Sequence, residues 1–127
     1  MPTVNLIGGW LGILAGVMFG AVIGLFFHDE NWLGGYASFP RRLVRLAHVA
    51  FFGLGFLNLA FAATARDLAL PDAYFRTASW SLIAGAIAMP ACCLAAAWRK
   101  PLRHLFPIPV ACVLAGLLAI LIGWWTR

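Results

Sequence analysis

Three histidines, His28, His48 and His104, lie inside or beside long apolar stretches. An ionisable side chain in such a position is unusual enough to suggest a function. Two imidazoles from neighbouring helices can ligate the iron of a haem b, and nearby arginines can pair with its propionates. One hypothesis is therefore a haem b site in which His48 and His28 are the axial ligands. Arg45 and Arg41 would bind the propionates.

A second interpretation of the histidines needs no cofactor, and we prefer it. Polar side chains inside membrane helices commonly hydrogen-bond a neighbouring helix, which is what we expect of His48. His28 and His104 would then be polar residues of the interface between membrane and water. The cofactor, if there is one, stays unknown at this level, with haem b as the candidate.

Basic residues form the next group with recognisable chemistry. One group lies at the start of an apolar stretch, and a second group separates two further stretches. The first group is Arg41, Arg42 and Arg45, and the second is Arg99, Lys100 and Arg103. If the two groups meet, they make a pocket for an anionic lipid headgroup. Basic residues beside apolar stretches are also typical of loops that orient membrane helices. The net charge of +5 therefore does not indicate nucleic-acid binding.

The acidic residues argue against transport coupled to protons. All four carboxylates, Asp29, Glu30, Asp67 and Asp72, lie in predicted loops or at helix ends. No buried acid is left for the proton relay of a proton-coupled multidrug exporter. The sequence also lacks a nucleotide-binding loop, an HExxH helix and a nucleophile elbow. We therefore expect no enzyme activity, except a redox role that a bound haem would supply.

Apolar stretches predict the elements that position these residues. The chain has 127 residues, of which 64% are hydrophobic and 10% charged. A helix needs about 20 apolar residues to cross a bilayer. Four stretches are long enough, at residues 4–27, 43–65, 77–98 and 105–125. The predicted fold is an all-α integral membrane protein, a bundle of four transmembrane helices in one domain covering residues 1–127.

The first stretch carries a glycine at every fourth position. These glycines are Gly8, Gly12, Gly16, Gly20 and Gly24. Small residues let helix backbones approach closely in lipid, so the stripe predicts a glycine zipper that packs against this chain or another subunit. Asn58, deep in the second stretch, is expected to form a hydrogen bond between helices.

Charge at the ends of the stretches predicts orientation. Six basic residues lie on the side of the first and third loops, and three, Arg66, Arg76 and Arg127, on the other side. Basic loops tend to stay in the cytoplasm. We therefore expect both termini to be extracytoplasmic, in a bacterial inner membrane.

Taken together, these features favour a structural or accessory subunit of a larger membrane complex, or a homo-oligomer. Its partners would be the lipid bilayer and other membrane subunits or itself, held through the glycine stripe, with an anionic lipid as a further candidate. Two alternatives stay open. One is a haem b electron-transfer subunit, and the other is a small oligomeric channel or carrier.

Overall fold

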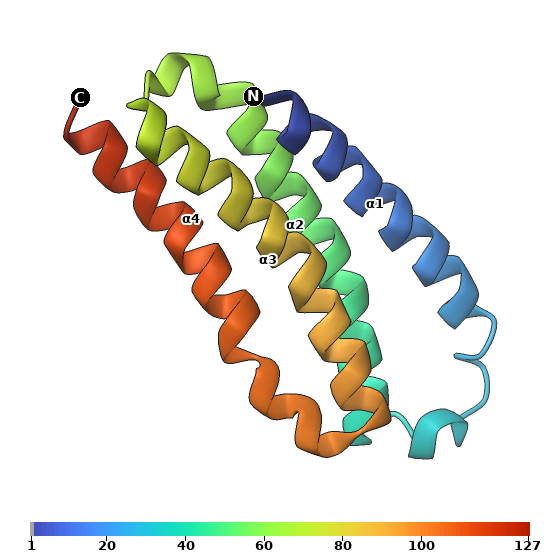
Figure 1. The fold of residues 1–127 in the computed structure, drawn as a ribbon. Coiled ribbons are helices and arrows are strands. Elements are labelled where there is room, and N and C mark those ends of the chain that lie inside the picture. The colour runs from blue at the N-terminus through green and yellow to red at the C-terminus, as the bar shows by residue number, and fades with distance from the viewer. Residues whose placement is uncertain (1) are drawn as a thin grey trace.

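The computed structural model of the protein describes residues 2–127 and consists of helices joined by short connections (Figure 1). The long helices are α1 (Pro2–Gly24), α2 (Phe39–Leu68), α3 (Asp72–Trp98) and α4 (Pro107–Trp125). Two 3-10 helices, η1 (Trp32–Gly34) and η2 (Lys100–Leu105), lie in the connections. All four long helices are long and apolar enough to cross a membrane. The prediction of an all-helical chain with four such helices is confirmed.

The four helices form an open row in the order α1, α2, α3, α4 (Figure 1). Each helix packs mainly on the next one in the sequence, and α1 makes a smaller contact with α3. Because α4 lies mainly against α3, α1 and α4 form the two edges of the row. Both termini lie at the same end, which we term the terminal end. The opposite end, with residues 25–38 and 99–106, is termed the basic end.

Helix boundaries differ from the predicted ones at both ends of the row, most at the start of α3, which begins at Asp72 instead of residue 77. α1 ends at Gly24 instead of residue 27, and turns follow it. α2 begins at Phe39 instead of residue 43, because Ser38 caps it by accepting a hydrogen bond from the backbone N–H of Arg41 (3.3 Å). Pro40 then lies in the first turn, where a missing N–H leaves no bond unmade.

The core lies between α2, α3 and α4 and is apolar. Phe61, Ala78, Leu82 and Ala119 are its buried members. Gly116 of α4 faces Leu82 so closely that a Cβ on this glycine would lie 2.9 Å from the leucine side chain. Small residues on α4 thus let α3 and α4 pack tightly.

Candidate functional site

Backbones of α1 and α2 touch at Gly12 and Gly9. A Cβ placed on Gly12 would lie 3.3 Å from both the Cα of Gly55 and the carbonyl oxygen of Phe51. A Cβ on Gly9 would lie 2.8 Å from the carbonyl oxygen of Gly55. Gly9 interrupts the four-residue spacing, and the sequence pattern did not single it out. The contact therefore needs glycine on both helices.

Ring side chains of α2 fill the next two positions of the stripe. A Cβ on Gly16 would meet the ring of Phe52 at 2.8 Å, and a Cβ on Gly20 would overlap the imidazole of His48. Here the missing glycine side chains make room for rings, and not for backbone. α1 thus presents shallow notches that fit the aromatic face of α2.

The two ends of the predicted stripe behave differently from its middle. Gly8 faces Ile83 of α3, so the stripe turns from α2 towards α3 as it approaches the terminal end. Gly24 is exposed, and no described residue comes within 4 Å of a Cβ placed on it. Gly24 therefore does not pack against another helix of this chain, and its contact with another subunit stays a prediction. The close contacts of the other glycines are all made within the chain.

Three buried polar residues join α1, α2 and α3 near the terminal end. Asn5 and Asn58 are fully buried, and Ser79 is 3% exposed. The Asn5 amide nitrogen donates to the Asn58 side-chain oxygen (2.7 Å) and to the Ser79 carbonyl oxygen (3.1 Å). The Ser79 hydroxyl donates in turn to the Asn5 side-chain oxygen. The Asn58 amide nitrogen donates to the carbonyl oxygens of Leu54 (2.9 Å) and Leu82 (3.3 Å).

Asn5 was missed as a site residue by sequence reasoning. The available signal was its position as the polar residue in the otherwise apolar run from Val4 to Phe27. A polar group in such a run needs a hydrogen-bond partner in a low-dielectric environment, and Asn58 was already expected to form a hydrogen bond between helices. We refer to Asn5, Asn58 and Ser79 as the polar triad.

Arg41 is buried at the basic end, where it is 2% exposed. Its guanidinium donates to the carbonyl oxygens of Phe27 and Asp29, at 3.1 Å each. A third bond reaches the carbonyl oxygen of Glu30 (3.2 Å). The guanidinium also lies over the rings of Phe27 and Trp32, at 4.9 and 5.6 Å from their centroids. Arg41 therefore holds the connection after α1 in place through Nη1 and Nη2, while its buried Nε has no hydrogen-bond partner within residues 2–127.

The remaining basic residues of the predicted headgroup pocket are spread over the basic end. Arg45 lies over the Tyr36 ring (4.0 Å) and donates to the Tyr36 carbonyl oxygen (3.3 Å). Arg42 is exposed on the first turn of α2. Lys100 lies 5.4 Å from the ring centroid of Phe39, so η2 does approach the start of α2. Lys100 of the second basic group thus lies near the start of α2, which carries the first group. The Arg41 guanidinium, however, bonds the connection after α1.

The three histidines occupy different environments. His28 and His104 are exposed, one in the turn after α1 and the other in η2. His48 is half-buried, with its ring against Gly20 and its edge towards Phe52 (centroids 5.2 Å apart). Its Nδ1 is buried and has no hydrogen-bond partner within residues 2–127. Within residues 2–127 this nitrogen therefore does not form the hydrogen bond to a neighbouring helix that was expected of the His48 side chain.

The position of His48 also bears on the haem hypothesis. A macrocycle between His48 and α1 would need open space in front of Gly20, and the imidazole itself fills that space. His28 follows α1 at the exposed surface. Among the described residues, no group of three or more His, Cys, Asp or Glu side chains could hold a metal ion.

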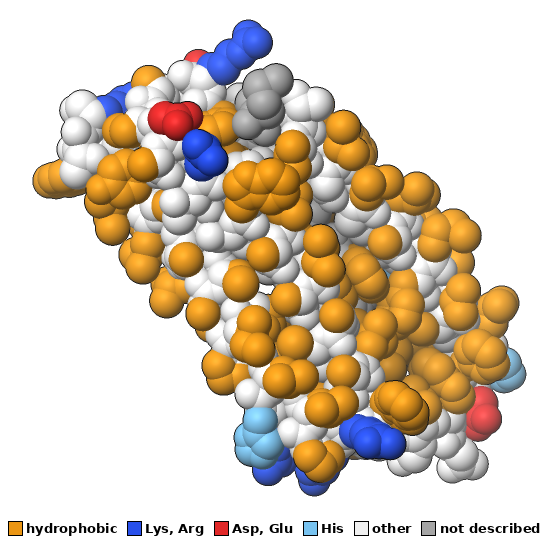
Figure 2. Space-filling view, viewed as in Figure 1, with side chains coloured by type: hydrophobic (Ala, Val, Ile, Leu, Met, Phe, Trp, Pro, Cys, Tyr) orange, Lys and Arg blue, Asp and Glu red, His pale blue; other side chains and the backbone are white. Residues whose placement is uncertain are grey.

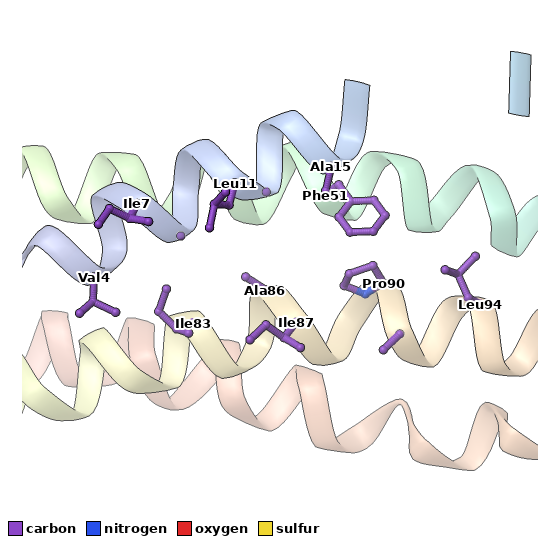
Figure 3. A pocket seen from close by; sticks show the side chains of 13 residues that line it. Val4, Ile7, Leu11, Ala15, Phe51, Ile83, Ala86, Ile87, Pro90 and Leu94 are labelled. Atoms are coloured by element: carbon purple, nitrogen blue, oxygen red, sulfur yellow. The ribbon is translucent and has the colours of Figure 1, made fainter. Parts of the chain in front are cut away.

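An apolar groove of about 680 Å³ lies between α1 and α3 (Figure 3). The α1 wall includes Val4, Leu11 and Ala15, and the α3 wall includes Ile83, Ile87 and Leu94. Phe51 of α2 and Pro90 of α3 face each other across it. The groove exists because α1 packs on α2 and only lightly on α3, and the sequence pattern gave no signal for it.

No family model matches the chain, and comparisons with curated proteins and with solved structures found no significant relative.

Proposed function

We propose that the protein is an integral membrane protein with four spans that serves as a structural or accessory subunit of a membrane assembly. The observation that carries this proposal is the polar triad, whose hydrogen bonds link three helices of one chain. Polar groups committed in this way fix the helix positions and are not available to a substrate. The role we infer is therefore scaffolding rather than catalysis.

The outer faces of the row support a membrane environment. Between its two ends the visible face carries many hydrophobic side chains and no charged ones, while charged side chains gather at the ends (Figure 2). On the edges, Trp10 of α1 and Leu121 of α4 are 60% and 61% exposed. Such extended apolar faces are typical of contact with lipid or with another subunit.

In this proposal the glycine zipper acts inside the chain, so other subunits bind elsewhere. α1 uses Gly9, Gly12, Gly16 and Gly20 to pack on α2. The α4 edge has a helix on one side only, because α4 lies mainly against α3. We therefore place the contact with a second copy or another subunit along the outer face of α4.

A photo-crosslinking amino acid at position 121 tests this contact in native membranes. Leu121 is exposed on α4, and we expect irradiation to give one discrete protein adduct, identified by mass spectrometry as a second copy or another subunit. The matched control is position 119, because Ala119 is 6% exposed and faces the core, and it should give no adduct between chains. Lipid adducts alone at position 121 would contradict the proposal.

We further propose that both termini are extracytoplasmic, in a bacterial inner membrane. Three of the nine basic residues lie in the basic end and three more, Arg41, Arg42 and Arg45, in the first two turns of α2 beside it. Basic loops of this kind are retained in the cytoplasm. A reporter fused after Arg127 should therefore be active outside the cytoplasm, and one inserted beside Gly35 should be active inside it. The reverse pattern of reporter activity would show that the orientation is wrong.

A further inference from the structure

The groove between α1 and α3 has the chemistry of a hydrocarbon site. Its walls consist of aliphatic and aromatic side chains together with Gly8 and Gly12. Among residues 2–127, no charged residue lines it. An apolar chain would therefore gain contacts here without leaving a polar group unpaired.

The length of the groove suits a single acyl chain. The α3 wall from Ile83 to Leu94 measures about 16 Å at 1.5 Å per residue, roughly half of the 30 Å hydrocarbon core of a bilayer. Half of the core is one leaflet, so one acyl chain of a phospholipid spans about this length.

The end of α3 beyond Leu94, the last residue of the groove wall, carries Trp98 and is followed by two cations, and we term this segment the mouth. Trp98 lies eleven residues after Ile87 of the groove wall, which places the two on the same face of α3. The Trp98 side chain is 81% exposed, and the Arg99 guanidinium lies 5.2 Å from its ring centroid. Lys100 follows and reaches towards Phe39 at the start of α2. An indole and two cations at the end of an apolar groove match the boundary between acyl chains and an anionic headgroup layer.

We propose that this groove binds one acyl chain of an anionic phospholipid, with the headgroup held by Arg99 and Lys100 at the basic end. The class of ligand follows from complementarity: the apolar walls favour a hydrocarbon chain, and the positively charged mouth favours a negative headgroup. The inference rests on the proposed membrane insertion. Carbonate extraction of membranes reports insertion separately, so failure of the lipid site and failure of the proposed function can be told apart.

Native mass spectrometry of the delipidated protein in detergent tests the site. The probes are palmitoyl-oleoyl phosphatidylglycerol, which is anionic, and the corresponding phosphatidylcholine, which has no net charge. We expect one phosphatidylglycerol to bind in preference to phosphatidylcholine. Ala91→Trp places an indole in the groove from an exposed position and should abolish this binding. The matched control Ala111→Trp, on the exposed surface of α4, should bind as the unmodified chain does.

A second pair of variants tests the mouth. Replacing Arg99 and Lys100 together by glutamine should weaken phosphatidylglycerol binding about thirty-fold, because two cations near the headgroup are lost. The matched control replaces Arg66 and Arg76, which are exposed at the terminal end, and should leave binding unchanged.

Three outcomes would overturn the proposal. Equal binding of the two lipids would show that the positively charged mouth does not contribute to binding. Unchanged binding by Ala91→Trp would show that the headgroup binds without a chain in the groove. A lipid-free dimer that Ala91→Trp dissociates would show that a second copy of the chain covers the groove instead.

Discussion

The Gly12→Leu variant is expected to lose about 3 kcal/mol of unfolding free energy, at the upper end of the usual cost of overpacking a core. Even a Cβ at this position would lie 3.3 Å from the Gly55 Cα and from the Phe51 carbonyl oxygen. Both are backbone atoms and cannot turn aside as a side chain can. The larger leucine must therefore push α1 away from α2. Equilibrium unfolding of the purified protein in mixed micelles would measure the loss.

Gly24→Leu is the matched control for this prediction. It makes the same change on the same helix, at a position where the structure leaves open space around the new Cβ. We expect its unfolding free energy to equal that of the unmodified chain. Gly12→Ala should fall between the two variants, because its methyl group needs a shift of only a few tenths of an ångström. Equal stability of Gly12→Leu and Gly24→Leu would show that α1 does not pack on α2 through this surface.

The Asn58→Ala variant should lose about 2 kcal/mol, since hydrogen bonds between membrane helices are worth about 0.6 kcal/mol on average and up to about 1.7. The variant removes the acceptor of the Asn5 amide and the donor to the Leu82 carbonyl oxygen. It also leaves the buried Asn5 amide nitrogen with a bond to the Ser79 carbonyl oxygen alone. The same unfolding experiment in mixed micelles would detect the change.

A double-mutant cycle isolates the bond between the two asparagines. Asn5→Ala and Asn58→Ala together should cost about 1 kcal/mol less than the sum of the single changes, because the shared bond is lost only once. Thr64→Val is the control on the same helix, since the Thr64 hydroxyl bonds only the Ala60 carbonyl of its own turn (2.8 Å). Strictly additive costs for Asn5 and Asn58 would contradict a direct interaction between them.

Apolar length made the four helices predictable from the sequence, because a run of about 20 apolar residues is itself the physical requirement for a span. Helix ends were less accurate. The start of α2 depends on the Ser38 cap, a local hydrogen bond that a hydropathy pattern does not contain. The end of α1 depends on the turns at residues 25–28. Apolar side chains occur in turns as well as in helices, so hydropathy does not reveal this end.

Side-chain partners were harder to predict than helices, since they depend on how helices are rotated against one another. Regular spacing placed Gly12 and Gly16 at the contact of α1 with α2, but it missed Gly9 and included Gly24, which has no such contact within the chain. Arg41 looked like a surface cation from its position beside a loop. Its burial follows from the path of the loop, which brings the carbonyl oxygens of Phe27 and Asp29 around the guanidinium. Neither the groove nor the polar triad could be derived without the three-dimensional pairing of α1 with α3.

Biosynthesis of a chain with this topology can proceed one helix at a time. Since α2 packs on α1, α3 on α2 and α4 on α3, every main contact is available as soon as the next helix emerges from the ribosome. The bond from Asn5 to Ser79 is different, because it joins residues 74 positions apart and must wait for α3. Until then the α1–α2 hairpin holds an incomplete set of hydrogen bonds, and arrival of α3 completes it. The third helix thus completes the polar triad, and the last helix then completes the apolar core through Ala119.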